Sequence, residues 1–494
     1  MTDLLGDAFD PERFRRLGHA WVDRLAAHLA EAQSGRMPVL PWRDPEAMLG
    51  AWPAEFGPGG GGDPLEFLDR FLREAQHLQH PRFVGHQCSA PLPLASLAGA
   101  LADLVNNGSA IYEMGPSATA MERSVLRWLA GRIGFDPARA DGVLTHGGSA
   151  GNLTALLAAR QASAPFDVWE EGLADRPPLC IVGSAEAHYS VKRSAQAMGL
   201  GSRGVRLVPA DERFRMHPRD LEAALDAAAS EGLRVMAVVA SAGSTATGAL
   251  DPLEPIGRIC RDRGLWLHVD AAHSGAVVVS ERLRPLIQGL EDADSVVVDA
   301  HKMLLQPALC TAVLFRDGER SYETFSQQAS YLFDRSARLE WFNIAHRTLE
   351  CTKRPLALGL YLTLKVHGEA LLAAFVERMW DLARDFADLI ERRPGWELAV
   401  RPESNIVCFR HLPQGEPDPD GLQSRIRQAI VEEGSFYLVK TRLRDRTWLR
   451  TTLVNPGTTL EDLACLLDRA EAWAAALRDG QGAPRWNHGE RRPG

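Results

Sequence analysis

The chain has 494 residues, of which 45% are hydrophobic and 24% are charged, and its 55 basic and 64 acidic side chains leave a formal net charge of −9. These values are typical of globular proteins, and they argue against a disordered chain, a fibrous repeat and a basic nucleic-acid-binding protein. The length suggests two or three domains of about 100–200 residues each.

The seven cysteines are scattered and form no C-x-x-C pair, a usage that fits a reducing compartment. The N-terminal stretch MTDLLGDAFDPERF is acidic early, whereas a signal peptide begins with a basic and then an apolar region. No run of about 18 uncharged apolar residues occurs, so we expect no membrane span. Together these features predict a cytoplasmic enzyme that binds neither nucleic acid nor a membrane.

The first element is an amphipathic helix, because apolar residues recur at three- and four-residue steps from Phe14 to Leu29. The stretch GPGGGGDP, residues 57–64, predicts a flexible loop, after which Asp63 and Pro64 are suited to begin another helix. No apolar strand precedes this loop, so a phosphate-binding role for its glycines is not favoured. We assign residues 1–85 to an N-terminal helical segment.

Six short, apolar and β-branched runs follow, and helical stretches separate most of them. The runs are Leu179–Val182, Val205–Val208, Val235–Ala240, Leu265–Val269, Ser295–Val298 and Ala312–Phe315. This alternation predicts parallel βαβ units with strands covered on both faces. After about residue 350, two long helical segments (356–366 and 371–390) precede short strands and a last helix near 460–477. The chain is therefore expected to be an α/β protein with a large, mostly parallel-sheet domain (86–370) and a small α+β domain (371–494).

Unusual polar residues fall where the predicted strands end. Asp270 ends one strand, Lys302 follows another, and Gly147, Gly148 and Ser149 precede a helix that is expected to begin near Asn152. Taken singly, these residues have simpler explanations: an ion-paired lysine, a carboxylate paired with arginine, and a turn. Together they match the needs of pyridoxal phosphate, which requires a lysine for its aldehyde, an acid for its pyridine nitrogen and an anion site for its phosphate.

A more specific resemblance rests on six segments that occur in a family's order and spacing. They are HPRFVGHQ (80–87), THGGSAGNLTALLAAR (145–160), AHYSVKRSAQAMGLG (187–201), GSTATGALDPL (243–253), WLHVDAAHSGA (266–276) and DAHKMLLQPALC (299–310). Over roughly residues 75–460 the chain resembles the group II pyridoxal-phosphate-dependent amino-acid decarboxylases, which act on glutamate, diaminobutyrate or aromatic amino acids. The resemblance implies the fold-type I transferase fold, pyridoxal 5'-phosphate as cofactor, and a homodimer that the N-terminal helices clasp.

The resemblance also implies roles for individual residues. Lys302 would bind the cofactor covalently, Asp270 would hold its pyridine nitrogen, and His188 would stack over its ring. Further cofactor contacts are implied for Gly148, Ser149, Thr245, Ala272 and His301. Asp299 stands where several members have asparagine, so we expect it to orient the lysine loop, and a contact with the phosphate becomes doubtful; Met303 replaces a frequent tryptophan and is expected only to pack.

Two matches concern the reaction and the substrate. Tyr331, in QQASYLFDRSAR (328–338), lies where the family has a mobile loop with a tyrosine that protonates the carbanion; a plain surface tyrosine is the alternative. Arg450, in WLRTTLVNP (448–456), matches the arginine that receives the substrate carboxylate. The side-chain pocket would be lined by His86, Gln87 and Ala110. Because bulky rings are missing from these positions, we expect a polar substrate of the diaminobutyrate or glutamate type.

Other functions stay open at this point. The enzyme could decarboxylate aromatic amino acids, or it could use the same cofactor as an aminotransferase or an aldehyde-forming lyase. It could also be an inactive relative. A remote alternative is a metal-dependent hydrolase with His268, Asp270 and His273 as ligands, although no further ligand set has fitting spacing and Lys302 then has no role.

Overall fold

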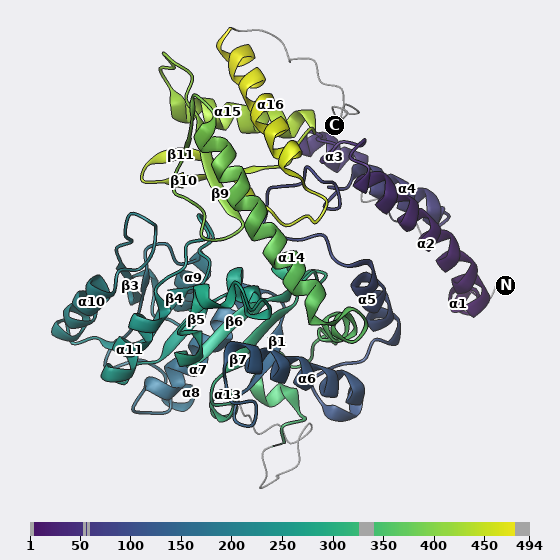
Figure 1. The fold of residues 1–494 in the computed structure, drawn as a ribbon. Helices are drawn as coiled ribbons and strands as arrows, with labels where there is room; N and C mark the ends of the chain where they lie inside the picture. The colour runs from purple at the N-terminus through teal and green to yellow at the C-terminus, as the bar shows by residue number, and fades with distance from the viewer. Residues whose placement is uncertain (1–3, 53–55, 57–59, 326–339, 480–494) are drawn as a thin grey trace. The chain divides into compact units, whose positions relative to one another are not determined.

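The computed structural model describes residues 4–52, 56, 60–325 and 340–479, and the remainder is drawn in grey in Figure 1. The chain forms two compact units. The large unit consists of Gln87–Ala383 and Val400–Ile406, and the small unit of Met1–His86, Arg384–Ala399 and Val407–Gly494. The domain boundaries after residues 85 and 370 stay a prediction.

A seven-stranded sheet in the order β1-β7-β6-β5-β4-β2-β3 forms the centre of the large unit. In chain order its strands are β1 (Asp141–Thr145), β2 (Leu179–Ser184), β3 (Val205–Val208), β4 (Arg234–Ser241), β5 (Leu267–Asp270), β6 (Ser295–Asp299) and β7 (Thr311–Phe315). The predicted α/β class with a mostly parallel sheet is confirmed, and each of the six predicted runs is a strand.

The strand β7 departs from the parallel pattern, because it pairs antiparallel with both β6 and β1. Only residues 300–310 separate β6 from β7, and a parallel crossover needs a dozen or more residues. The strand β1 was not among the predicted runs, since its sequence DGVLT contains a charged residue and a glycine.

Helices surround this sheet in Figure 1. Those of the large unit are α5 (Pro93–Val105), α6 (Pro116–Ile133), α7 (Gly148–Ser163), α8 (Val168–Glu171), α9 (Tyr189–Ala197), α10 (Pro218–Ser230), α11 (Leu253–Arg263), α12 (Ala300–Met303) and α13 (Glu319–Phe325). Short 3-10 helices cover Tyr112–Met114, Ser202–Gly204, Ser274–Val279, Arg284–Ile287, Leu290–Asp292 and Ile344–Arg347. The helix α7 begins four residues before the expected Asn152, because Gly147 turns the chain with φ 103°.

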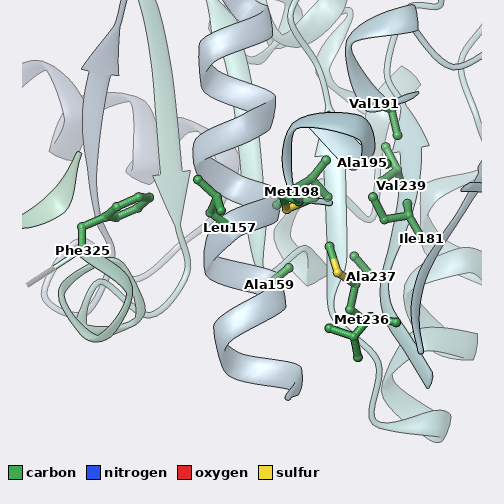
Figure 2. Close-up of a cluster of buried hydrophobic side chains, with 12 residues drawn as sticks. Leu157, Ala159, Ile181, Val191, Ala195, Met198, Met236, Ala237, Val239 and Phe325 are labelled. Carbon is green, nitrogen blue, oxygen red and sulfur yellow. The ribbon is translucent and has the colours of Figure 1, made fainter. Parts of the chain in front are cut away.

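One part of the core of the large unit lies between the helices α7 and α9 and the strands β2 and β4 (Figure 2). Its members include Leu156, Leu157, Leu179, Ile181, Val191, Met198, Met236 and Val239. Burying one side chain of this size contributes about 1.5–3 kcal/mol. The core therefore holds the sheet and α7 rigidly, and with them the strand ends that carry the candidate site.

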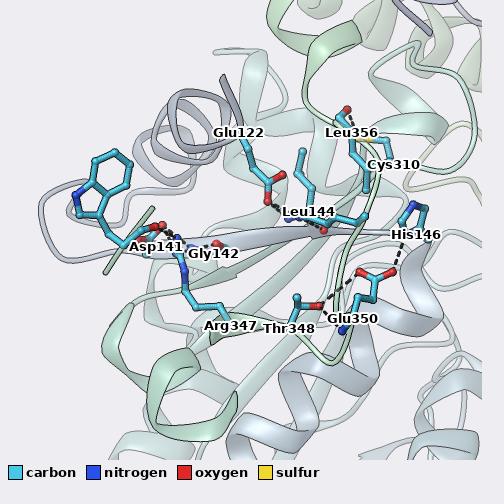
Figure 3. Close-up of polar contacts among 12 residues, drawn as sticks. Glu122, Asp141, Gly142, Leu144, His146, Cys310, Arg347, Thr348, Glu350 and Leu356 are labelled. Atoms are coloured by element: carbon cyan, nitrogen blue, oxygen red, sulfur yellow. Dashed lines mark hydrogen bonds and ion pairs between the residues drawn. The ribbon is translucent and has the colours of Figure 1, made fainter. Parts of the chain in front are cut away.

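The chain that follows residue 340 is tied by polar contacts to α6, to the edge strand β1 and to the residue after β1 (Figure 3). These are Arg347–Asp141 at 2.7 Å, Lys353–Glu122 at 2.5 Å and the carboxylate–imidazole contact Glu350–His146 at 2.6 Å. Lys353 also donates to the carbonyl of Leu144 at 2.6 Å, and the Lys353 and Glu122 side chains are only 1% and 2% exposed. The contacts hold the strand that leads into Gly147 and α7.

The small unit contains the helices α1 (Leu4–Ala8), α2 (Pro11–Gln33), α3 (Pro45–Ala51), α4 (Pro64–Glu74), α15 (Pro419–Glu433) and α16 (Leu460–Arg478). Its four-stranded sheet has the order β10-β11-β9-β8, formed by β8 (Trp396–Leu398), β9 (Ile406–His411), β10 (Val439–Leu443) and β11 (Arg446–Thr452). The predicted start of α4 is confirmed, since Asp63 accepts from the Leu65 N–H at 2.8 Å and Pro64 is the first helical residue.

The long helix α14 (Leu358–Arg392) runs through residues of both units. Gly368, with φ 71°, interrupts it between the two helical segments that the sequence predicts. Among the described residues it is the one helix long and apolar enough to cross a membrane, which is weak evidence because core helices of soluble proteins share these properties.

Candidate active site

One pocket of the large unit lies where the parallel strands end. Seven of the residues predicted from the sequence line it: Gly148, Ser149, His188, Thr245, Asp270, Ala272 and Lys302. Six further lining residues had no predicted cofactor contact: Asn152, Ser241, Gly243, Ser244, His273 and Asp299. Residues from five strand-to-helix connections thus meet in one place.

The N-terminus of α7 forms one wall of this pocket. The first N–H groups of a helix have no partner within it, and together with the helix dipole they favour an anion. Gly148 stands here because a Cβ at this position would lie 3.1 Å from the Asp299 carboxylate. Gly148 and Ser149 are therefore suited to bind a phosphate group.

The carboxylate of Asp270 is placed so that it can pair with a positively charged group in the pocket. Its side chain is mostly buried; Oδ2 accepts from Asn152 Nδ2 at 2.8 Å and Oδ1 accepts from the Ala272 N–H at 3.1 Å. Because both donors are neutral, the charge of the carboxylate is oriented but not cancelled. A protonated pyridine nitrogen fits such a carboxylate.

Behind Asp270 lies a chain of buried hydrogen bonds that the sequence did not predict. Asn152 Oδ1 lies 3.0 Å from His268 Nε2, and Asn152 Nδ2 also donates to Ser190 Oγ at 2.9 Å. Burial lowers the pKa of His268 to about 4, so its imidazole is neutral near pH 7. A neutral ring that donates from Nε2 accepts at Nδ1, where Ser295 Oγ lies at 2.9 Å.

This chain bears on the hydrolase alternative. Both nitrogens of His268 are engaged with Ser295 and Asn152, and Nε2 of His273 lies 2.6 Å from Asn405 Oδ1. The described part of the chain contains no group of three or more His, Cys, Asp or Glu side chains that could hold a metal ion. The residues proposed as metal ligands therefore do not form a ligand set in this geometry.

His188 lies at the start of α9 and lines the pocket. Its Nδ1 is 2.7 Å from Ser190 Oγ, so the amide of Asn152 is linked through Ser190 to this ring as well as to Asp270. Burial lowers the pKa of His188. A neutral imidazole fixed in this way is suited to stack on an aromatic ring.

Lys302 is paired with Asp299, whose Oδ2 lies 2.8 Å from Nζ. Burial by itself lowers the pKa of Lys302, but the charges of Asp299 and Asp270 raise it, and the net pKa lies above the ordinary value. The two carboxylates thus outweigh burial, and Lys302 forms the ion pair that the sequence analysis gave as its simpler explanation.

The remaining predicted cofactor contact is His301, which is buried with Nδ1 2.9 Å from the Cys310 carbonyl. Its Nε2 lies 3.8 Å from Asp299 Oδ2, and its expected position facing the phosphate stays a prediction. Met303 is fully buried, as expected of a packing residue.

The residues predicted to bind substrate are distributed over both units. In the large unit, Gln87 precedes Cys88, whose thiol has a pKa raised by burial and lowered by the charge of Lys302, with burial the larger effect. Ala110 is buried, and its carbonyl accepts from the Ala345 N–H at 3.1 Å. Gln87 Nε2 is a buried donor without a hydrogen-bond partner among the described residues. Tyr331 lies outside the described residues.

In the small unit, Arg450 and His86 belong to one cluster. Arg450 lies on β11 and is 7% exposed, and burial lowers its pKa. The pKa of His86 is lowered by burial and then by the charges of Arg450 and Arg427. The ring of Tyr437 lies 5.6 Å from His86. This part of the small unit is therefore positively charged.

Comparisons with known proteins agree with this chemistry. A family model described as the pyridoxal-dependent decarboxylase conserved domain matches residues 68–412. The chain is 33% identical over 451 residues to human cysteine sulfinic acid decarboxylase, covering 88% of this chain and 90% of that protein. It is 29% identical over 444 residues to L-2,4-diaminobutyrate decarboxylase of Acinetobacter baumannii, covering 86% of each.

A comparison of folds also finds a decarboxylase of this family. The crystal structure of mouse CSAD superposes with a TM-score of 0.86 at 29% identity, covering 94% of this chain and 99% of that one. The fold expected from the resemblance is thereby confirmed. A lysine, a carboxylate held by neutral donors, a fixed imidazole and a helix N-terminus in one pocket fit the requirements of pyridoxal phosphate.

Proposed function

Because the chain belongs to the pyridoxal-dependent decarboxylase family and is a pyridoxal-phosphate-dependent carboxy-lyase, we propose that it converts an acidic L-amino acid to the corresponding amine and CO2. The bound cofactor supplies an aldehyde for the substrate amine and a ring that accepts the electron pair left when CO2 departs. The observation that carries the substrate class is the second positive charge that acts on His86, that of Arg427, in addition to Arg450.

We assign the following roles to residues of the large unit. Lys302 Nζ is the amine that bonds to the cofactor aldehyde and later carries protons. Asp270 stabilises the positive charge of the pyridine nitrogen, and Asn152 keeps the Asp270 carboxylate oriented through its 2.8 Å hydrogen bond. His188 covers one face of the ring. Thr245, Ala272 and His301 complete the cofactor contacts.

We assign to Arg450 the binding of the substrate α-carboxylate. A guanidinium can hold a carboxylate through two parallel hydrogen bonds, which fixes its orientation as well as its position. Arg450→Lys keeps the charge and loses the paired geometry, so it should raise KM strongly. We assign to Tyr331 the protonation of the carbon from which CO2 departs. Tyr331→Phe should therefore divert turnover from amine formation to oxidative products.

The substrate side chain is proposed to be a carboxylate or sulfinate. Two positive charges act on His86, those of Arg450 and Arg427. Because Arg450 is assigned to the α-carboxylate, Arg427 is the charge left to attract an anionic side chain and to repel the ammonium of 2,4-diaminobutyrate. The buried Nε2 of Gln87 is a donor that suits an anionic oxygen. The identity to human cysteine sulfinic acid decarboxylase, 33%, also exceeds that to the diaminobutyrate enzyme, 29%.

The test is a product screen with added cofactor. Cysteine sulfinate, aspartate, glutamate, 2,4-diaminobutyrate, dopa and tryptophan are supplied in turn, and CO2, amine and keto acid are measured. We expect CO2 and amine in equal amounts, fastest with an acidic substrate. Faster turnover of 2,4-diaminobutyrate or dopa would contradict the substrate class, and keto acid without CO2 would point to an aminotransferase.

We further propose a homodimer in the cytoplasm. Apolar side chains of α5 are exposed on one stripe, with Leu97, Leu101 and Leu104 at 57%, 50% and 64%, and Phe14 and Val22 of α2 are exposed as well. A stripe of this kind needs a covering surface, and a second copy of the chain supplies one by two-fold symmetry. Light scattering should give twice the chain mass of 54.1 kDa. A monomer that is fully active would contradict the proposed dimer.

The proposed location in the cytoplasm rests on the cysteines. All seven are free thiols, as is usual for proteins of a reducing compartment.

A further inference from the structure

Asp299 is the second carboxylate of the pocket, and its contacts are those of a buried counter-ion. It ends β6 and its side chain is 2% exposed. Oδ2 lies 2.8 Å from Lys302 Nζ, and Oδ1 accepts from Thr311 Oγ1 at 2.5 Å. The Asp299 backbone N–H donates to the carbonyl of Ala272 at 3.1 Å. Strand register and two hydrogen bonds therefore fix this carboxylate beside the lysine.

A fixed, buried carboxylate changes what the lysine can do. An ammonium has no lone pair, so Lys302 can attack an aldehyde only after the Nζ–H bond breaks, the proton passes to solvent and the electron pair stays on nitrogen. Breaking the pair leaves Asp299 charged and buried without its partner, which is unfavourable. The pair thus opposes the reactive form of Lys302.

We propose that Asp299 is a positioning residue that holds Lys302 as an ammonium in the cofactor-free protein and so sets the pH above which Lys302 reacts with an aldehyde. The inference rests on the proposed role of Lys302 as the cofactor lysine. It assigns to Asp299 a role in cofactor loading that is separate from the role of Asp270 toward the pyridine nitrogen.

Other ionisable groups face this pair, and none replaces Asp299. Asp270 from β5 adds a second negative charge near Lys302, and the thiol of Cys88 adds a weaker influence. His188 from α9 feels the charges of both Lys302 and Asp299. Nε2 of His301 lies 3.8 Å from Asp299 Oδ2, and the buried thiol of Cys310 feels the Asp299 charge. Only Asp299 is within ion-pair distance of Nζ among the described residues.

The test measures the pH at which Lys302 of the cofactor-free protein reacts. The protein is incubated from pH 5 to 10 with pyridoxal phosphate or with pyridoxal, reduced with borohydride, and the label on Lys302 is quantified by peptide mass spectrometry. Asp299→Asn keeps the side-chain shape and removes the charge. We expect its labelling profile to shift down by at least about one pH unit, which is a roughly tenfold gain in label below the midpoint.

Two further variants serve as a control for the loss of a charge and as a replacement for Asp299→Asn. Asp317→Asn removes a half-buried aspartate of the same unit that has no contact with Lys302 in the structure and should leave the profile unchanged. Thr311→Val removes the hydrogen bond to Oδ1, so the buried Asp299 charge depends more on Lys302 and the profile should shift to higher pH; this variant serves if Asp299→Asn does not fold. The shift should appear with both aldehydes.

Three results would overturn the inference. Identical profiles for the wild-type protein and Asp299→Asn would show that Asp299 does not control Lys302. A shift with pyridoxal phosphate but not with pyridoxal would show that Asp299 acts on the phosphate instead. Absence of label on Lys302 in the wild-type protein would remove the proposed cofactor lysine itself, an outcome distinct from the first two.

Discussion

Replacing Lys353 by methionine tests the buried ion pair behind the candidate site. The Lys353 and Glu122 side chains are 1% and 2% exposed and lie 2.5 Å apart. Without the lysine, Glu122 keeps one donor, the Leu144 N–H at 2.9 Å, but its charge is buried without a counter-ion. Breaking a pair of this kind costs about 3–5 kcal/mol, so Lys353→Met should lower the free energy of unfolding by that amount.

The double variant Glu122→Gln, Lys353→Met separates the cost of an unpaired buried charge from the cost of altered packing. Glutamine carries no charge and its oxygen can still accept from Leu144, so the double variant should recover at least about 2 kcal/mol relative to Lys353→Met. Equilibrium unfolding in urea of the cofactor-free protein, followed by tryptophan fluorescence, measures all three proteins.

An exposed pair serves as the control. Arg139 lies 4.0 Å from Asp317 and its side chain is 72% exposed, so Arg139→Met should cost less than about 1 kcal/mol. If the double variant were as unstable as Lys353→Met, the loss would come from packing, and the reasoning from buried charge would be wrong.

Three further predictions concern the site. The pKa of His268 is about 4 because it is buried, whereas in the unfolded chain it is about 6.5. The unfolded chain therefore binds a proton that the native protein does not, and stability falls by about 3 kcal/mol as the pH drops from 6.5 to 4; His268→Gln should flatten the urea midpoint against pH in this range. Asn152→Ala removes the hydrogen bond to the Asp270 charge, worth about 1.5–3 kcal/mol, and should weaken cofactor binding roughly 10–100-fold in a fluorescence titration, whereas an unchanged dissociation constant would remove Asn152 from the site. Gly243 has φ 96°, and a Cβ there would lie 2.3 Å from Ser274 Oγ, so Gly243→Ala should displace the loop after β4 and reduce the circular dichroism of the bound cofactor; a signal equal to the wild type would show that the loop yields freely.

The sequence determined six of the seven strands of the large sheet and the location of the site, because both depend on local patterns. A run such as Val235–Ala240 is apolar on both faces, which only a strand buried on both sides requires. Polar residues that directly follow such runs, Asp270 and Lys302 among them, must meet at one edge of a parallel sheet. The place of the pocket in the fold was therefore predictable from the pattern, whereas most of its individual contacts were implied by the family resemblance.

The tertiary structure decided which side chains hold one another. Asn152 and His268 are 116 residues apart and meet only because α7 packs on the sheet beside β5. The antiparallel direction of β7 brings Thr311 opposite Asp299, and this register fixes the carboxylate beside Lys302. Periodicity describes which face of an element is buried, but it contains no information about register or partner. The hydrogen bond from Thr311 that fixes the Asp299 carboxylate therefore became visible only in the folded chain.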